Sequence, residues 1–188
     1  MRNPRPLTEL AQTAVAAVLK PGARAIDATM GNGHDTLFMA HGVAPGGKII
    51  AFDIQGQALE NTREKLIAAH LEPMVELHRC GHEQMGSRVP PDWAGRVAAV
   101  IFNLGYLPGG DKRLITRAAT TRSALEQALA LLQPGGLLSL MLYRGHSGAD
   151  EESAAVHDWI DGLDQAYRVK RLESPGPLLF LVEKLQRA

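Results

Sequence analysis

The sequence predicts an α/β fold with a mostly parallel sheet that ends in an antiparallel hairpin. Short apolar runs alternate with helical segments along most of the 188 residues, and this alternation is typical of parallel strands joined by helices. Residues 97–102 form a continuous apolar run, as expected of a strand buried on both faces. The last two predicted strands are separated only by residues 174–177, and such a short connection permits only antiparallel pairing.

The helices are predicted from apolar residues that recur every three or four positions. Leu7, Leu10 and Val18 belong to one such stripe, which ends before Pro21. Pro134 ends a later and longer helical segment in the same way. The predicted helices are residues 7–19, a helix that begins with 35–40, and residues 58–70, 114–132 and 151–163.

The strands are predicted from short apolar runs that lie between turn residues. Clusters of glycine and proline at residues 45–47 and 134–136 separate several of these runs from the preceding helix. The predicted strands are residues 23–27, 48–53, 74–78, 97–102, 137–142, 167–172 and 178–184.

Length and composition predict one domain spanning residues 1–188, with enough core to fold alone. The formal net charge is zero, which excludes a global polycation but is compatible with a local basic patch. Cys80 is the only cysteine, so an internal disulfide is excluded, and no Cys and His residues have the spacing of a metal site. Without an apolar signal core or a membrane-length apolar run, we expect a cytoplasmic protein that does not span a membrane.

The most informative segment is the glycine-rich turn between the first predicted strand and the next helix. Gly31 and Gly33 allow close approach of a ligand to the backbone, and the helix that follows offers unpaired N–H groups. Asp27 would repel a pyrophosphate but attract a cation. S-adenosylmethionine carries a sulfonium and an ammonium and has no phosphate, so the turn favours S-adenosylmethionine, although Gly-x-Gly also occurs in ordinary loops.

Asp53 ends the next predicted strand, about 20 residues after Gly33, where a carboxylate can accept both ribose hydroxyls of an adenosine. This feature suits NAD and S-adenosylmethionine equally. Thr36 stands where the dinucleotide fingerprint has a small residue, and no second domain remains for a dehydrogenase. A NAD-dependent oxidoreductase is therefore the weaker alternative, as is a non-catalytic adenosine-binding module of an RNA complex.

Asn103 and Tyr106 follow the fourth predicted strand, and active-site loops of open α/β sheets lie at the carboxyl ends of strands. An Asn with an aromatic residue three positions later resembles the Asn-Pro-Pro-Tyr loop of amino-group methyltransferases. The side-chain oxygen of Asn103 and the carbonyl of Leu104 can accept the hydrogens of an amine, and Tyr106 can stack on a base. The alternative is a structural turn, because Asn and Gly are common turn residues.

Three histidines lie in predicted loops at this edge of the sheet. His146 follows the strand of residues 137–142 and could orient a substrate or accept a proton near neutral pH. His34 lies in the glycine-rich turn, and His82 follows the third strand. For each of them, a hydrogen-bonded loop histidine without a functional role is an equally good interpretation.

Basic residues cluster just beyond Asn103, at Lys112, Arg113, Arg117 and Arg122. Cations beside an active-site loop could hold RNA phosphates, together with Arg144 on the neighbouring loop. The alternative is a helix face that is merely solvated.

Three segments resemble one known family: residues 27–36 (Asp-Ala-Thr-Met-Gly-Asn-Gly-His-Asp-Thr), 52–55 (Phe-Asp-Ile-Gln) and 102–112 (Phe-Asn-Leu-Gly-Tyr-Leu-Pro-Gly-Gly-Asp-Lys). They are similar to the family long labelled "putative rRNA methylases", whose characterised members are tRNA 5-(aminomethyl)-2-thiouridine methyltransferases. The resemblance spans nearly the whole chain. It implies a Rossmann-like class I methyltransferase fold, S-adenosylmethionine as cofactor, and N-methylation of the 5-aminomethyl group of the wobble uridine in tRNA anticodons.

Together, the motifs and the resemblance imply a set of site residues. The expected catalytic residues are Asn103, Tyr106 and His146. The expected cofactor-binding residues are Asp27, Thr29, Gly31, Asn32, Gly33, His34, Asp35, Thr36, Asp53, Ile54, Gln55, His82, Glu83 and Asn103. The residues expected to bind substrate or RNA are Leu104, Gly105, Tyr106, Lys112, Arg113, Arg117, Tyr143, Arg144 and His146.

A further family pattern maps onto Tyr143, Gly145, His146, Gly148 and Glu152, with Ala149 where the pattern has its last glycine. The expected partner is the anticodon region of tRNA. Methylation of rRNA or of a small amine is the alternative within the same class. The oligomeric state stays open, with a homodimer as one alternative.

Overall fold

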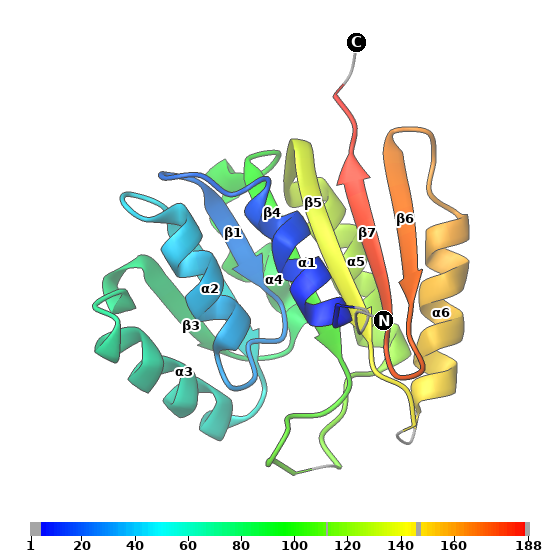
Figure 1. The fold of residues 1–188 in the computed structure, drawn as a ribbon, viewed down its shortest axis with the longest axis horizontal. Coiled ribbons are helices and arrows are strands. Elements are labelled where there is room, and N and C mark those ends of the chain that lie inside the picture. The colour runs from blue at the N-terminus through cyan, green and yellow to red at the C-terminus, as the bar shows by residue number, and fades with distance from the viewer. Residues whose placement is uncertain (1–4, 112, 146–147, 187–188) are drawn as a thin grey trace.

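The computed structural model describes residues 5–111, 113–145 and 148–186, and within them one seven-stranded sheet has the order β3-β2-β1-β4-β5-β7-β6 (Figure 1). The strands are β1 Arg24–Asp27, β2 Lys48–Asp53, β3 Val75–Arg79, β4 Val97–Leu104, β5 Leu132–Leu142, β6 Tyr167–Glu173 and β7 Leu178–Lys184. Strands β1 to β5 pair in parallel, whereas β7 is antiparallel to both β5 and β6. The predicted parallel sheet with a C-terminal antiparallel hairpin is confirmed.

Helices cover both faces of this sheet (Figure 1). They are α1 Leu7–Ala16, α2 His34–Val43, α3 Gly56–Ala68, α4 Met85–Arg88, α5 Ala118–Leu131 and α6 Ala149–Asp161, with short 3-10 turns at Glu72–Met74, His82–Gln84 and Pro91–Trp93. Helices α1, α2 and α3 pack on one face, and α4, α5 and α6 pack on the other. No helix of the described residues is both long and apolar enough to cross a membrane.

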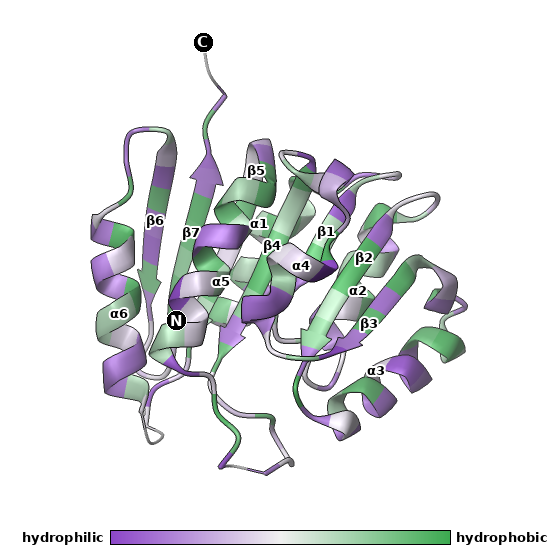
Figure 2. Cartoon of the chain, turned by 180° about the vertical axis from the view of Figure 1, so that it is seen from behind, coloured by the Kyte–Doolittle hydropathy of each residue, from purple (hydrophilic) through white to green (hydrophobic). Residues whose placement is uncertain are grey.

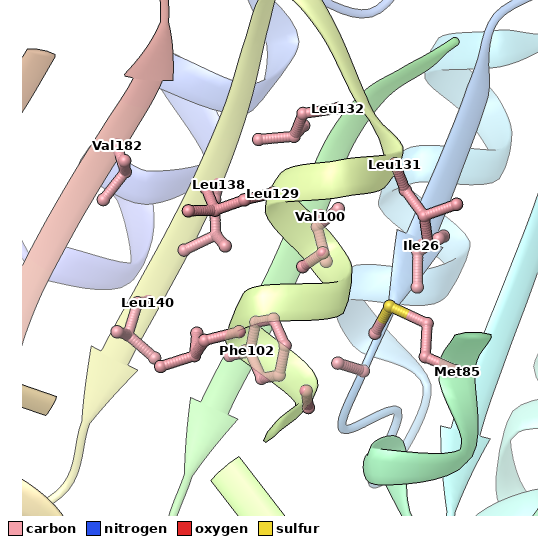
Figure 3. Packing of buried hydrophobic residues seen from close by; sticks show 14 of the residues in the cluster. Ile26, Met85, Val100, Phe102, Leu129, Leu131, Leu132, Leu138, Leu140 and Val182 are labelled. Carbon is pink, nitrogen blue, oxygen red and sulfur yellow. The ribbon is translucent and has the colours of Figure 1, made fainter. Parts of the chain in front are cut away.

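The largest apolar cluster lies between the sheet and α5 (Figure 3). Phe102 of β4 and Leu140 of β5 are buried there beside Leu129 of α5. Strand β4 is apolar along most of its length, whereas the edge strand β6 carries mostly polar residues (Figure 2). Burying a side chain such as Phe102 contributes roughly 1.5–3 kcal/mol, so this cluster holds the central strands firmly in register.

Most element boundaries differ from the sequence prediction by one to three residues, and three differences affect the site or the central strands. Strand β4 continues to Leu104, so Asn103 lies in the strand and not after it. Helix α5 begins at Ala118 instead of residue 114, because Ile115 pairs with Tyr106 in an isolated β-bridge. Strand β5 begins at Leu132 instead of residue 137, because a register irregularity opposite β4 accommodates Pro134 and its glycines within the strand.

The parallel strands end at one edge of the sheet (Figure 1), where the predicted site residues Asp53 and Asn103 lie near the ends of β2 and β4. Residues 105–111 and 113–117 extend beyond this edge, and the start of α1 lies near it (Figure 1). This placement follows from the topology, because the carboxyl ends of β1, β2, β4 and β5 necessarily meet on the same side.

Candidate functional site

A cavity of about 950 Å³ opens at the carboxyl ends of β1, β2 and β4. The predicted site residues that line it are Thr29, Gly31, Asn32, His34, Asp35, Asp53, Ile54, Gln55, His82, Glu83, Asn103, Gly105, Tyr106, Arg113, Arg117, Tyr143 and Arg144. Asp27, Gly33, Thr36 and Leu104 do not line it. Lys112 and His146 lie outside the described residues.

Asp27 lies beneath the cavity surface and is completely buried. Its carboxylate accepts hydrogen bonds from the Thr36 hydroxyl at 2.6 Å and from the Thr29 N–H at 3.2 Å. Burial, followed by the nearby charge of Asp35, raises the pKa of Asp27 to about 7, although both hydrogen bonds lower it. Asp27 therefore ties the turn after β1 to the first turn of α2, beneath the cavity surface.

The two glycines of the turn have different structural roles. At Gly33, which has a φ of 78°, an added Cβ would lie 2.7–2.9 Å from atoms of Thr62 on α3. Only glycine therefore permits this packing of the turn against α3. Gly31 has a φ of 51° and lines the cavity, where its N–H donates to the Asp53 carboxylate at 3.0 Å.

Asp53 ends β2 and presents its carboxylate to the cavity. Its second oxygen accepts the N–H of Gln55 at 2.9 Å. Burial raises the pKa of Asp53, while the hydrogen bonds from Gln55 and Gly31 lower it. Each carboxylate oxygen has a second lone pair, so Asp53 can accept further hydrogen bonds from a ligand with two adjacent hydroxyls.

Asn103 is held at both its backbone and its side chain. Its N–H donates to the Thr29 hydroxyl at 2.7 Å, and its side-chain Nδ2 donates to the Asp35 carboxylate at 2.8 Å. The neighbouring Leu104 carbonyl, which we expected to accept an amine hydrogen, accepts the N–H of Tyr143 at 3.0 Å and lies off the cavity lining. Of these two residues at the strand end, Asn103 therefore lines the cavity and Leu104 does not.

Residues 105–109 and 113–117 form one wall of the cavity, which is fixed at several points. Thr116 donates its N–H to the Gly105 carbonyl at 3.0 Å, beside the bridge that carries Tyr106. The hydroxyl of Thr116 donates at 2.6 Å to Glu152, a residue of α6 that is 2% exposed. Asn32 donates at 3.1 Å to the Pro108 carbonyl and so ties this wall to the glycine turn.

His82 lines the cavity from the segment after β3 and is buried. Its ring contacts Phe102 edge-on, with 5.6 Å between the ring centroids. Burial lowers the pKa of His82, while Glu83 and a hydrogen bond to the backbone of Ala28 raise it. Its Nε2 is buried without a partner among the described residues, and such an atom is expected to meet a ligand or water.

The cavity lining carries charges of both signs. The carboxylates of Asp35 and Asp53 lie at the glycine turn, and the lining also includes Arg113, Arg117 and Arg144. The Arg113 side chain is 89% exposed and forms an ion pair with Asp111 at 2.7 Å. Hydrogen bonds from Arg113 lower the pKa of Asp111 to about 2.

Arg122, the fourth member of the predicted basic cluster, pairs with Glu126 at 3.5 Å and does not line the cavity. The ion pairs of the described residues include neither Arg117 nor Arg144. These two cations are therefore better placed than Arg113 or Arg122 to meet an anionic partner.

Sequence reasoning missed two residues that support the site, Thr8 and Gln12, and named a third, Glu152, only through the family pattern. Thr8 and Gln12 of α1 line the cavity, and Gln12 donates to Asp35 at 2.9 Å. Glu152 holds the wall segment from a distance of 36 residues along the chain. Polar residues on the face of an amphipathic helix carry no sequence signal for a site, and only the resemblance drew attention to Glu152.

The sheet order, the reversed strand β7 and the glycine turn after β1 define a Rossmann-like class I methyltransferase fold. Residues 49–175 match the model of the family described as "Putative rRNA methylase", and the chain belongs to this family. The predicted fold class and family are thereby confirmed.

Three proteins illustrate the similarity. The chain is 43% identical over 164 residues to the "tRNA (mnm(5)s(2)U34)-methyltransferase, chloroplastic" of Arabidopsis thaliana, covering 83% of this chain but only 59% of that relative. A "putative rRNA-methylase" structure from Clostridium thermocellum superposes with a TM-score of 0.92 at 35% identity, over 98% of this chain and all of that one. A "putative methyltransferase" from Streptococcus mutans in complex with SAH has a TM-score of 0.86 at 39% identity, with the same coverage of both chains.

Proposed function

We propose that this chain is an S-adenosylmethionine-dependent N-methyltransferase that acts on the 5-aminomethyl group of the wobble uridine in tRNA. The observation that carries the proposal is the cavity in which Asp53, at the end of β2, and Asn103, at the end of β4, face the same space. The name of the Arabidopsis relative supports the choice of substrate. The SAH bound to the Streptococcus mutans protein supports the choice of cofactor.

The residues around the glycine turn fit S-adenosylmethionine better than a dinucleotide. The carboxylate of Asp53 lines this part of the cavity, and the carboxyl group of Asp27 lies just beneath its surface. Such a surface suits a sulfonium and an ammonium and would repel a pyrophosphate. The unpartnered Nε2 of His82 offers a polar contact for the edge of a heterocycle. Asp53 would hold the ribose hydroxyls.

When bound, S-adenosylmethionine supplies an electrophilic methyl group. The side chains of this chain contribute position and exclude water. Asn103 accepts a hydrogen of the substrate amine at Oδ1 and thereby directs the nitrogen lone pair. Tyr106 lies in the wall of the cavity, where its ring can stack on the uracil base. The amine must lose its extra proton before transfer, to solvent or to His146 as the candidate base.

We also propose that the anticodon region of tRNA lies across the cavity opening. Arg117 and Arg144 are the side chains best placed to contact its phosphates, because neither is engaged in the ion pairs of the described residues. A reducing cytoplasm is the compartment that we propose, in which Cys80 stays a free thiol. We propose a homodimer as the assembly, and light scattering of the purified protein would test it.

Incubation with labelled S-adenosylmethionine and tRNA that lacks only the terminal methyl group tests this function. Nucleoside mass analysis should find the added methyl on the 5-aminomethyl group of the wobble uridine. Matched tRNA that already carries the methyl should take up no label. Label that enters rRNA, and not tRNA, would reject the proposed substrate while keeping the reaction class.

A further inference from the structure

We infer that Asp35 is a positioning residue that fixes the orientation of the Asn103 amide, so that its oxygen faces the substrate amine. This inference rests on the proposed function, because it explains how Asn103 can serve an amine acceptor. Asp35 lies in the first turn of α2, and Asn103 lies near the end of β4. Both residues line the cavity.

The orientation follows from the hydrogen-bonding capacity of the two groups. Nδ2 of Asn103 lies 2.8 Å from Oδ2 of Asp35. An ionised carboxylate only accepts hydrogen bonds, whereas an amide has one donating and one accepting end. The donating end must therefore face Asp35, and Oδ1, on the other branch of the amide, must face away from it.

An amide in the opposite orientation would not serve the reaction. It would present an NH₂ group to the substrate amine, and this group can donate only to the nitrogen lone pair that must attack the methyl group. It would also place the amide oxygen against a carboxylate, which is repulsive. The same carboxylate thus favours the productive orientation and opposes the unproductive one.

The carboxylate is itself held in place. Gln12 of α1 donates its side-chain N–H to Oδ1 of Asp35 at 2.9 Å. The backbone N–H of Asn103 donates to the Thr29 hydroxyl, which fixes the position of the strand end. Gln12, Asp35 and Asn103 therefore form a chain of side-chain hydrogen bonds that links α1 to the acceptor position.

The test exchanges the two side chains. In Asp35→Asn, the new amide can donate or accept, so it no longer selects one orientation of Asn103. In Asn103→Asp, two carboxylates face each other. In the double variant, which combines Asp35→Asn with Asn103→Asp, the amide introduced on α2 can donate to the carboxylate introduced on β4 and still accept from Gln12. Every hydrogen bond is thereby restored, and an acceptor again faces the substrate amine.

We expect each single variant to lower kcat for tRNA methylation by about 10²-fold, a typical effect of misplacing a reacting group. The double variant should recover to within about tenfold of the wild type. The dissociation constant of S-adenosylmethionine should change less than threefold throughout. Asp92→Asn is the matched control, because Asp92 is an exposed carboxylate that pairs with Arg24 at the start of β1, and its kcat should not change.

A double variant that is no more active than the single variants would overturn the inference. So would a single Asp35→Asn variant whose main defect is cofactor affinity, because Asp35 would then be a cofactor ligand. Urea unfolding of the wild type, the two single variants and the double variant tests the Asp35–Asn103 pair without any activity measurement. It therefore distinguishes failure of this inference from failure of the proposed function. The exchanged pair should restore the unfolding midpoint lost in the single variants, even if the wild type proved inactive on tRNA, and additive losses would reject the pair itself.

Discussion

The backbone N–H of Gly31 donates to the carboxylate of Asp53 at 3.0 Å. This hydrogen bond joins the glycine turn after β1 to the end of β2, two segments that are 22 residues apart in the chain. The Asp53 carboxylate, which we assign to the ribose of the cofactor, therefore also stabilises the glycine turn beside the cofactor site.

Replacing Asp53 with Ala should weaken S-adenosylmethionine binding by about 1–3 kcal/mol, because charged hydrogen bonds to the ribose and to Gly31 are lost. Isothermal calorimetry measures this change. Asp92→Ala removes an exposed carboxylate remote from the cavity and should leave the affinity unchanged. Unaltered affinity in a folded Asp53→Ala protein, or tight NAD binding by the wild type, would refute the cofactor assignment.

Gly33→Ala should lower the free energy of unfolding by more than Gly22→Ala does. Both glycines have positive φ, 78° and 82°, so both substitutions cost about 1–2 kcal/mol of backbone strain. Only at Gly33 does the new Cβ also meet Thr62, at 2.7–2.9 Å, whereas nothing lies within 4 Å at Gly22. Urea denaturation gives both values, and equal losses would show that the turn does not pack on α3 as described.

The raised pKa of Asp27 predicts a pH dependence of stability. The unfolded carboxyl has a pKa near 3.8 and the native one about 7. Between these values the native protein holds a proton that the unfolded chain has released. This group therefore stabilises the fold at the low end of the window, and its contribution is lost as pH rises through about 7.

Asp27→Asn cannot titrate, so its free energy of unfolding should fall less between pH 4.5 and pH 7 than that of the wild type. Urea unfolding at several pH values measures both slopes. His82, whose pKa is lowered by burial, contributes with the opposite sign but is present in both proteins. Identical slopes would mean that Asp27 is ionised throughout this range.

Arg117→Gln/Arg144→Gln should weaken tRNA binding and reduce the slope of log affinity against log salt by about 2, one for each lost phosphate contact. Asp111→Asn/Arg113→Gln removes an existing ion pair, keeps the net charge, and should leave the slope nearly unchanged. Binding of tRNA measured at several salt concentrations distinguishes the two variants. An equal effect of both would indicate that Arg113 leaves Asp111 to contact RNA.

The order of strands and helices could be predicted from the sequence because each element has its own periodicity and its own terminating residues. The site could be predicted in outline, because topology brings the strand ends that carry Asp53 and Asn103 to one edge. The predicted start of α5 was wrong. Leu114 and Ile115 fit the apolar pattern of the helix, but Ile115 pairs with Tyr106 in a β-bridge. The local sequence cannot show whether these two residues form a helical turn or a β-bridge.

Contacts between distant segments were beyond sequence reasoning. Gln12 and Asp35 are 23 residues apart, and Asp35 and Asn103 are 68 apart. Nothing in the local pattern of either helix indicates these hydrogen bonds. The basic cluster near residue 113 was predicted as a unit, but its charges differ in availability because Asp111 and Glu126 pair with two of them.

The central claim is that Asn103 orients the acceptor amine beside a cofactor held by other residues. Single-turnover methyl transfer to tRNA, measured for Asn103→Ala together with the dissociation constant of S-adenosylmethionine, tests it most directly. We predict a rate lowered by about 10²-fold with an affinity within threefold of the wild type. An unchanged rate, or a loss of cofactor affinity as large as the loss of rate, would contradict the account.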